Sequence, residues 1–417
     1  MAKAEKRQII RDPIHGFIRL TDQERLIIDS PEFQRLRGVK QLGLTDLVYP
    51  SATHTRFAHS IGSMHVAGLI AQQVGLSKDQ YRLARLCLLL HDIGHGPFSH
   101  LFDVICKVAA ESAYEHEAIG RQIVHDSTEI QAALGADAPT VEEELLGKRR
   151  SVIHDIVSGG LDADKLDYLR RDSHFAGVNY GRFDFERILW TLETDGLHIV
   201  VLEKGMDSIE GLRLARQQMW VQVYTHHARL IADNMMCRLV EMNCRGNQER
   251  KDRLKFDDVT HSAFRVLSLD DHRFLQSLEV EVNGEARELL DRLSARHLLK
   301  RALDSRVEDI PIDARSDILS RKLKTEQIED EIAQISGVPR HLVFAVIPRV
   351  DMKQYHGLAG GEPLLIKPEN GGDLIDFGRL EGIRVGDENP RRLYIFGPLE
   401  AKAKLREASI QYLGNYH

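Results

Sequence analysis

The stretch from Leu86 to His100 constrains the fold of this chain more than any other, because an apolar run there ends in a cluster of polar side chains. Its sequence is Leu-Cys-Leu-Leu-Leu-His-Asp-Ile-Gly-His-Gly-Pro-Phe-Ser-His. The run delivers the adjacent His91 and Asp92, and His95 follows closely. A buried carboxylate beside imidazoles is costly unless a cation compensates it, and a divalent metal is the usual cation. The stretch therefore predicts a metal centre inside a packed fold.

The His-Asp pair alone is weak support for a metal, because the chain repeats it at His125-Asp126 and His154-Asp155. The first copy differs from the others because an apolar run precedes it and glycines and further histidines follow it. The chain has 20 histidines, and ten of them lie between residues 54 and 174. This concentration favours one site in that third of the chain over the alternative of ordinary buried histidines.

Composition describes a globular chain of 417 residues, with 42% hydrophobic and 29% charged residues. No apolar run approaches the roughly 18 residues that a membrane-spanning helix needs, so no membrane partner is expected. No apolar segment follows the charged first residues, so secretion is not indicated. The four cysteines are widely spaced, which predicts reduced thiols in a cytoplasmic protein.

The net charge of −7 argues against a chain that coats nucleic acid through a broad basic face, without excluding nucleic acid as a partner. It is compatible with a small anionic substrate in a locally basic pocket.

The periodicity predicts a mainly α fold, with a helical core over about 1–250. Residues 21–43 open with a capping-box pattern, Thr-Asp-Gln-Glu, and carry helical spacing that is interrupted near Pro31. Further helices are expected at about 57–74, 79–92, 99–109, 114–126, 163–171, 183–193 and 207–244. The polar segment 126–150 predicts a surface excursion, and the β-branched residues at 197–202 predict a strand.

The pattern changes after about residue 250. Charged helices are expected at about 256–266, 283–296 and 324–336, strands at 341–347, 363–366 and 392–396, and a last helix near 400–412. This order predicts a smaller C-terminal α+β lobe over 251–417.

A metal site in a helical fold needs ligands from several elements. His59 lies early in one expected helix, His91 and Asp92 end another, and Asp164 begins a third. Two imidazoles and two carboxylates suit Mn, Mg, Fe or Zn and leave positions open for water and substrate. Taken alone, His59 is also compatible with a helix-face histidine, and Asp164 with a helix cap.

The order His…His-Asp…Asp resembles the HD-domain metal phosphohydrolases. Within that superfamily, five motifs resemble the deoxynucleoside-triphosphate triphosphohydrolases, and the nearest pattern is that of the vertebrate SAM-and-HD-domain enzymes and their bacterial relatives. These motifs are Asp12-Pro-Ile-His-Gly, Phe33-Gln-Arg-Leu-Arg, Lys40-Gln-Leu-Gly, His54-Thr-Arg-Phe-Ala-His-Ser and His91-Asp-Ile-Gly-His-Gly-Pro-Phe-Ser-His. The motifs run in the family's order from about residue 11 to 230. Only about ten residues precede the first one, so no SAM domain is expected before it.

The resemblance implies that this chain hydrolyses deoxynucleoside triphosphates (dNTPs) to deoxynucleoside and triphosphate. It assigns His59, His91, Asp92 and Asp164 to the metal. It also implies an acid/base set composed of His95, His100, Asp103, His116 and Glu117. Such a set suits the reaction, because the departing 5′-oxygen needs a proton and an imidazole can supply one.

The resemblance also implies a nucleotide pocket. The cations at Arg56, Lys165 and Arg216 would hold phosphate oxygens. Gln41, Leu42, Tyr168, Asp172, Tyr224 and His226 would surround the sugar, with Tyr168 against its 2′ edge and Asp172 accepting its 3′-hydroxyl. From the residues alone, surface cations and half-buried aromatic side chains remain the alternatives.

Asp29 and Arg37 match positions that read a regulatory nucleotide in the family, whereas His227 replaces a family lysine. The family also implies a homodimer or homotetramer. Two other functions stay open: an HD phosphohydrolase or nuclease acting on another nucleotide or on DNA ends, and a nucleotide sensor without turnover.

Overall fold

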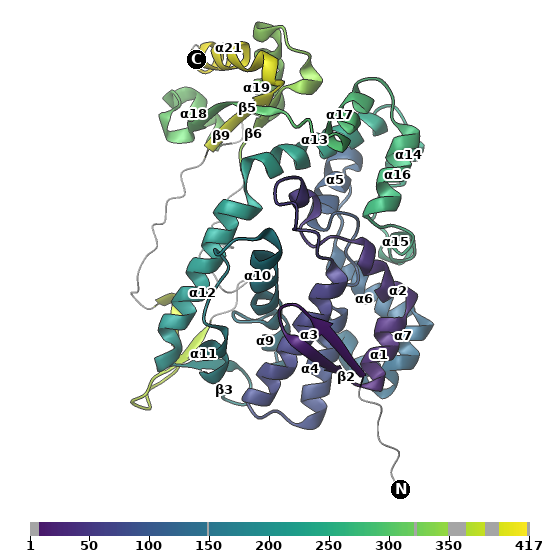
Figure 1. Cartoon of the computed structure of the whole chain (residues 1–417), viewed down its shortest axis with the longest axis vertical. Coiled ribbons are helices and arrows are strands. Elements are labelled where there is room, and N and C mark those ends of the chain that lie inside the picture. The colour runs from purple at the N-terminus through teal and green to yellow at the C-terminus, as the bar shows by residue number, and fades with distance from the viewer. Residues whose placement is uncertain (1–7, 148–149, 321–322, 349–363, 380–391, 415–417) are drawn as a thin grey trace.

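The computed structural model describes residues 8–147, 150–320, 323–348, 364–379 and 392–414. The fold is mainly helical with an α+β part near the C-terminus, which confirms the predicted class. In Figure 1 the α+β part lies above the helical core, at the end of the molecule opposite the N-terminus.

An antiparallel hairpin of β1 (Gln8–Asp12) and β2 (Gly16–Leu20) opens the described chain. Its turn is closed by Asp12, whose Oδ1 atom accepts hydrogen bonds from the backbone of Ile14 and His15 at 2.8 and 2.9 Å. Gly16 follows at φ +74°, a backbone conformation that glycine adopts without steric cost. The turn therefore holds His15 in a fixed place.

Helices α1 (Asp22–Asp29) and α2 (Pro31–Gln34) come next. Thr21 and Glu24 form the predicted capping box at the start of α1, and Pro31 begins α2 as the sequence indicated. Buried Ile27 and Phe33 attach the two helices to the core.

The centre of the molecule is formed by α3 (Arg56–Gln73) and α4 (Lys78–Leu90), and α10 (Ala163–Ala176) packs against α3. The apolar run Leu86–Leu90 at the end of α4 is fully buried. The first turn of α3, the residues directly after α4 and the first turn of α10 carry the three groups of predicted metal ligands.

The remaining core helices surround this centre. They are α5 (His100–Ala110), α6 (His116–Asp126), α7 (Thr128–Leu134), α8 (Ala138–Leu145), α9 (Val152–Ser158), α11 (Phe185–Trp190), α12 (Met206–Met219) and α13 (His227–Cys244).

The segment 126–150 is not the predicted surface excursion, because it contains α7 and α8. Ile130, Leu134, Ala138 and Val141 are buried. Their spacing of three or four residues places one apolar face of this polar segment on the core.

Two other expected helices are shorter than predicted, one because it is interrupted and one because it ends early. The helix expected over 207–244 is interrupted by a π-helical turn, Trp220–Tyr224, where the Thr225 hydroxyl donates to the Trp220 carbonyl at 2.8 Å. Such side-chain bonds compete with the helical backbone ladder. The helix expected over 183–193 ends at Trp190 and is followed by strand β3 (Leu192–Thr194).

Helices α14 (Gln248–Asp252), α15 (Val259–Val266), α16 (Asp271–Glu281) and α17 (Gly284–Ser294) follow the core helices in the chain. They belong to the core by their packing, since α15 lies on α6 and α17 lies on α13. We therefore propose that the border between core and C-terminal lobe lies after α17 rather than at residue 250.

The C-terminal lobe is built on the antiparallel sheet β5-β9-β6, against which α19 and α21 pack. Its elements are β5 (Lys300–Arg306), α18 (Ile312–Leu319), α19 (Thr325–Ser336), β6 (Phe344–Val346), β9 (Arg392–Gly397) and α21 (Lys402–Gly414). The strands expected at 341–347 and 392–396 and the last helix are thus present.

A second sheet joins distant parts of the chain in the order β3-β4-β7-β8. Strand β4 (Ile199–Leu202) pairs in parallel with β7 (Leu365–Lys367), and β8 (Ile375–Asp376) pairs with β7. Both β4 and β7 were expected as strands, although residue 363 lies outside the described residues. The pairing ties the C-terminal segment to the core.

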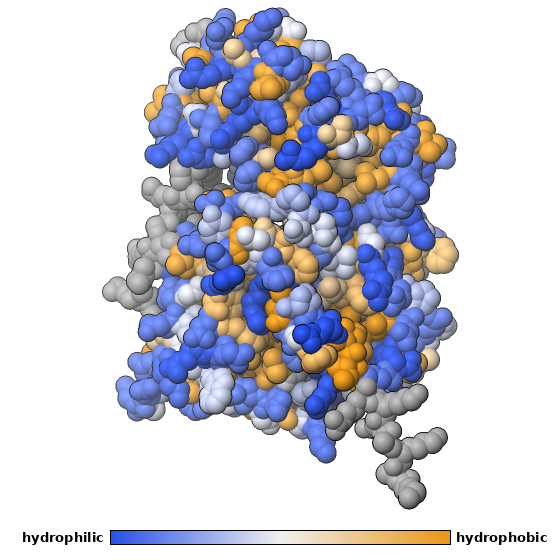
Figure 2. All heavy atoms as spheres, viewed as in Figure 1, coloured by the Kyte–Doolittle hydropathy of each residue, from blue (hydrophilic) through white to orange (hydrophobic). Residues whose placement is uncertain are grey.

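Among the described helices, none is both long and apolar enough to cross a membrane. The face in Figure 2 is mostly hydrophilic, with apolar patches that hydrophilic side chains interrupt.

Candidate metal centre

The predicted metal ligands converge from three helices. His59 comes from the first turn of α3, Asp164 from the first turn of α10, and His91 and Asp92 directly follow α4. His59 Nε2 lies 2.9 Å from Asp164 Oδ1 and 3.5 Å from Asp92 Oδ2. His91 Nε2 lies 3.4 Å from Asp92 Oδ1 and 3.7 Å from Asp164 Oδ1. One ligand atom each of His59, His91 and Asp164 lies within 4.8 Å of the others.

The state of His91 supports a cation at this position. Its Nδ1 atom bonds the Leu88 carbonyl at 2.7 Å and is therefore the protonated nitrogen of the neutral ring. Its Nε2 atom is buried and has no hydrogen-bond partner among the described residues. A buried polar atom left in this way costs free energy. A divalent cation would satisfy it, so the residues fit a metal.

The electrostatics of the cluster favour ionised carboxylates. Burial raises the pKa of Asp92, but the opposing effects, of which the charge of Arg56 is the largest, hold this pKa well below its usual range. The pKa of Asp164 is likewise lowered, because the hydrogen bond from His59 and the charge of that ring outweigh the effect of burial.

Burial also lowers the pKa of His59, but hydrogen bonds to Asp164 and Asp167 and the charge of Asp92 outweigh it and raise this pKa to about 10. Without a metal, His59 therefore carries a proton that a bound cation would displace.

The residues of the predicted acid/base set form a second cluster beside the first. One nitrogen each of His95, His100 and His116 lies within 4.8 Å of the others, and the His95 and His116 rings stack at 3.9 Å. Asp103 Oδ2 lies 3.4 Å from His100 Nδ1 and 3.7 Å from His116 Nδ1. Asp92 connects the two clusters, because its Oδ1 atom lies 3.3 Å from His95 Nε2.

The second cluster opens on a cavity of about 250 Å³, lined by Asp103, Tyr114, Glu115, His116, Glu117, Ala118 and Arg121. Glu117 is exposed, and among the described residues no hydrogen bond or ion pair joins it to the three histidines. Burial, Arg56 and His116 hold the pKa of His95 well below its usual range, so its imidazole is neutral.

The loop between α4 and α5 brings the clusters together. A Cβ atom on Gly94 would lie 2.1 Å from the His116 carbonyl oxygen and 2.4 Å from the Gly120 nitrogen. Only glycine therefore lets this loop approach α6 closely. Phe98 and Ser99 both have φ +58°, and Asp271 fixes this strained turn by accepting the Phe98 N–H at 2.6 Å.

The three predicted phosphate-binding cations differ in their burial and in the groups they contact. Arg56 is buried and donates to Asp92 at 2.6 Å and to Ser99 at 2.9 Å. The Lys165 ammonium pairs with Asp162 and the Gly159 carbonyl, so it is not joined to the metal ligands. Arg216, in the last turn of α12, is half-buried, and its charge acts on both Tyr168 and Tyr224.

The predicted sugar-binding residues are partly engaged with protein groups. The Tyr168 ring lies 6.5 Å from that of His59. Asp172 accepts the Tyr224 hydroxyl at 2.6 Å on one oxygen and pairs with His54 at 2.8 Å on the other.

The other three predicted sugar-binding residues have different surroundings. Gln41 and Leu42 are buried, and Gln41 Oε1 has no hydrogen-bond partner among the described residues. His226 caps α13, where its Nδ1 atom accepts the Ala228 N–H at 3.2 Å.

Asp29 and Arg37, the predicted regulatory pair, are both exposed and have separate partners. Asp29 pairs with Arg25 at 2.8 Å. Arg37 lies over the Phe57 ring at 3.6 Å and donates to Gln34 at 2.7 Å.

Four residues that were not predicted as site residues form a hydrogen-bond network on the side of His59 away from the metal ligands. Asp167 accepts a hydrogen bond from His59 Nδ1 at 2.8 Å and is itself contacted by His15 and Arg171, while Asp12 holds Arg171. Asp167 lies one helical turn beyond Asp164, a spacing that signals a shared helix face.

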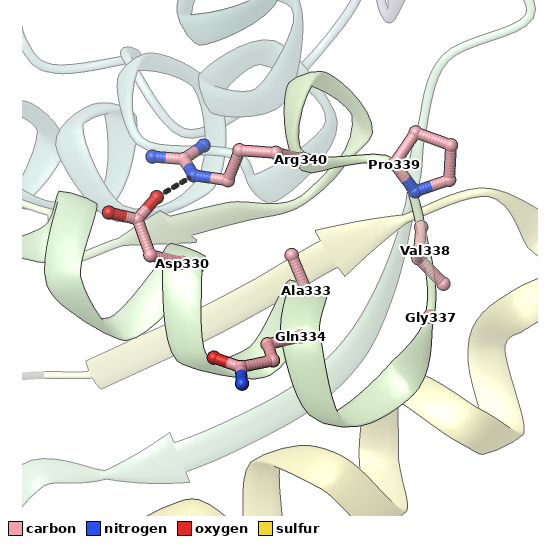
Figure 3. Close-up of a pocket in the computed structure, with 7 residues that line it drawn as sticks. All are labelled: Asp330, Ala333, Gln334, Gly337, Val338, Pro339 and Arg340. Carbon is pink, nitrogen blue, oxygen red and sulfur yellow. Dashed lines mark hydrogen bonds and ion pairs between the residues drawn. The ribbon is translucent and has the colours of Figure 1, made fainter.

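A wider depression of about 510 Å³ lies on the C-terminal lobe and is lined by residues of α19 and the segment after it (Figure 3). Its cation, Arg340, is paired with Asp330 and Glu329. The depression therefore presents no unpaired cation to a ligand and lacks the histidines of the metal centre.

Two family profiles match the chain. The HD domain profile matches residues 56–172, and the HD associated region profile matches residues 183–358. The first match contains all four predicted metal ligands.

Three known proteins illustrate the similarity. An uncharacterized protein of Methanocaldococcus jannaschii is 43% identical over 63% of this chain and 55% of its own length. Deoxynucleoside triphosphate triphosphohydrolase SAMHD1 of Homo sapiens is 29% identical over 70% of this chain and 54% of its own length. The crystal structure of a hypothetical protein from Aquifex aeolicus is 28% identical, with a TM-score of 0.74 over 96% of this chain and 99% of that one.

This chain thus spans just over half the length of the two curated relatives. Its helical centre, its His and Asp ligand cluster and the two profile matches agree with one another. The chain therefore carries an HD domain over residues 56–172, followed by an HD associated region over residues 183–358.

Proposed function

We propose that this protein hydrolyses dNTPs to deoxynucleoside and inorganic triphosphate in a metal-dependent reaction. The observation that carries the proposal is the adjacency of the two clusters, with Asp92 contacting both. A ligand set with open positions beside an imidazole proton donor suits hydrolysis at a phosphate. The SAMHD1 relatives, whose name states this activity, support the choice of substrate.

In the proposed reaction, the oxygen of a water attacks the α-phosphorus, and the bond from that phosphorus to the 5′-oxygen breaks. The 5′-oxygen leaves with a proton. When bound, a divalent cation would lower the pKa of water and offset phosphate charge. His59, His91, Asp92 and Asp164 would hold it.

The protein's own groups supply the proton and the positioning. His100 and His116 of the second cluster would hold the proton for the 5′-oxygen, and Asp103 would orient both rings, while the neutral His95 stacks on His116. Arg56 is placed to share its charge between Asp92 and a phosphate oxygen. Tyr168 would pack against the 2′ edge of the sugar and exclude a ribose hydroxyl.

The test is to incubate the full chain with Mn²⁺ and each dNTP or ribonucleoside triphosphate (NTP) and to separate the products by ion-exchange chromatography. Release of triphosphate with deoxynucleoside is expected. Pyrophosphate or monophosphate would instead indicate another phosphohydrolase, and binding without any product would indicate a nucleotide sensor.

A further inference from the structure

The carboxylate of Asp167 is completely occupied by donors. Its side chain is fully buried. Oδ1 faces His15 Nε2 at 2.6 Å and Arg171 Nη2 at 2.9 Å, while Oδ2 faces His59 Nδ1 and Arg171 Nε, both at 2.8 Å. Two oxygens with two lone pairs each accept four hydrogen bonds, so this acceptor is saturated.

This saturation fixes the orientation of His59. An ionised carboxylate only accepts hydrogen bonds, so His59 Nδ1 must be the protonated nitrogen. The lone pair of the neutral ring then belongs to Nε2, which faces Asp92 and Asp164. A histidine that binds metal through one nitrogen ordinarily has its other N–H held by such a carboxylate.

The β1–β2 turn belongs to the same network. Arg171 Nη1 donates to Asp12 Oδ2 at 2.9 Å, and Asp12 Oδ1 closes the turn that carries His15. His15 and Asp167 are 152 positions apart in the chain. The Asp-Pro-Ile-His-Gly motif, which the proposed reaction does not use, therefore supplies a side chain directly behind the metal centre.

We infer that the β1–β2 turn positions the metal ligand His59, with His15 as a positioning residue that acts through Asp167. The inference rests on the metal site of the proposed function. His15 holds one oxygen of Asp167, which leaves the other aligned on His59 Nδ1. Without His15, only Arg171 holds the carboxylate from the side away from His59, so the alignment of Asp167 on His59 Nδ1 weakens and Nε2 is held less firmly toward the other ligands.

The first experiment measures Mn²⁺ affinity of the full chain by calorimetry without nucleotide, in His15→Leu and His15→Gln. A glutamine amide places a donor near the position of His Nε2, whereas leucine retains bulk without a donor. We expect His15→Leu to weaken Mn²⁺ binding about 10–100-fold and His15→Gln to restore most of the affinity.

The matched control is His65→Leu. The His65 ring lies 5.2 Å from that of His15, and no hydrogen bond joins it to Asp167 in the described chain. Both leucine variants remove one histidine of this contacting pair, so the thermal unfolding of the metal-free proteins reports any general loss of packing. His65→Leu should retain the Mn²⁺ affinity of the unmodified chain.

A second variant, Asp167→Asn, keeps the shape but replaces one acceptor oxygen with an N–H₂ donor. If that amide faces His59, the ring must accept at Nδ1 and carry its proton on Nε2, toward the metal. We expect a larger loss of Mn²⁺ affinity than in His15→Leu.

The outcomes separate the two claims. Unchanged Mn²⁺ affinity in His15→Leu, or equal losses in His15→Leu and His65→Leu, overturns the positioning role while the metal site stands. A loss in His15→Gln as large as in His15→Leu also overturns it, because the donor would not matter. Absence of Mn²⁺ binding by the unmodified chain overturns the metal site itself.

Discussion

Asp92 contacts more of the site than any other side chain described above. Its Oδ2 atom accepts Arg56 at 2.6 Å and lies 3.5 Å from His59, and its Oδ1 atom lies 3.3 Å from His95. These neighbours keep the Asp92 carboxyl ionised, so a substitution that removes its charge affects both clusters at once.

Asp92→Asn is therefore expected to lose the metal and to lower hydrolysis at least about 100-fold. Metal content by mass spectrometry and triphosphate release measure the two effects. Asp126→Asn is the matched control, since it changes the exposed copy of the same His-Asp pair on α6. Full metal occupancy with normal turnover in Asp92→Asn would contradict the assignment.

Tyr168 is the second residue with a specific expected effect. It lies four residues after Asp164 on α10, on the side of His59. Tyr168→Ala should lower the ratio of dNTP to NTP hydrolysis, because it opens the space where a 2′-hydroxyl would lie. Tyr168→Phe keeps the ring and should keep the ratio. Rates on paired dNTP and NTP substrates measure it, and an unchanged ratio in Tyr168→Ala with surviving dNTP activity rejects this role.

The sequence predicted the residues that the structure brings together at the centre, because His59, His91 and Asp164 sit at helix ends marked by clear apolar periodicity. It did not identify His15 or Asp167 as site residues. Their contact joins residues 152 positions apart, and a single sequence carries no signal for such a pairing. The partner of Lys165 was missed for a different reason, since the nearby Asp162 acts both as the cap of α10 and as the counter-ion of Lys165.

At the scale of elements, the loop between α4 and α5 depends on its glycines. Gly94→Ala should lower the free energy of unfolding by about 1–3 kcal/mol or more, because its Cβ atom would overlap the backbone of α6. It should also separate His95 from His116 and slow hydrolysis.

Denaturant unfolding and triphosphate release measure both effects. Gly211→Ala on α12 is the control, since no atom lies within 4 Å of its added Cβ, and its stability should stay within about 1 kcal/mol. Equal stability and turnover of the two variants would contradict the packing argument.

Helix α13 carries a buried carboxyl that makes stability depend on pH. Burial raises the pKa of Asp233 from 3.8 to about 6, and only Arg229 opposes this effect. Since the folded state holds this proton more tightly than the unfolded state, ionisation destabilises the fold. The penalty grows from about pH 4 to about pH 6 and then stays constant, at about 3 kcal/mol.

Asp233→Asn removes this penalty. Relative to the unmodified chain, the variant should gain about 2 kcal/mol between pH 4.5 and pH 7. Denaturant unfolding across that range measures the gain. Glu241→Gln, a more exposed carboxylate on the same helix that pairs with Arg245, is the control. A constant difference between Asp233→Asn and the unmodified chain would show that the carboxyl does not titrate in this range.

Elements with strong local signals were predicted well, whereas those that depend on tertiary contacts were not. The capping box of α1 and the apolar run of α4 are local, and both appear as expected. Strand β5 reads Lys-Arg-Ala-Leu-Asp-Ser-Arg and was missed, because its pairing with β9 rather than its composition makes it a strand. Helices α7 and α8 were missed because a polar composition concealed a narrow buried face.

At the scale of the whole molecule, we propose self-association as a dimer or tetramer. The family resemblance motivates it, and β5 and β6 form the two edges of a small sheet in the described part of the lobe. Light scattering at micromolar protein, with and without dGTP or GTP, measures it. A monomer under all conditions contradicts the proposal. An oligomer that ignores nucleotide leaves it standing but removes the regulatory role of Asp29 and Arg37.

The parallel pairing of β4 with β7 has a consequence for how the chain reaches its native state. Roughly 160 residues separate Leu202 from Leu365, so at typical rates of synthesis β4 waits about 10–30 s for its partner to emerge. During that interval the β3–β4 hairpin presents an open strand edge, which is a template for unwanted pairing between nascent chains. The sheet thus depends on a non-local contact that cannot form until the C-terminal segment has been made, and the open β4 edge favours aggregation before then.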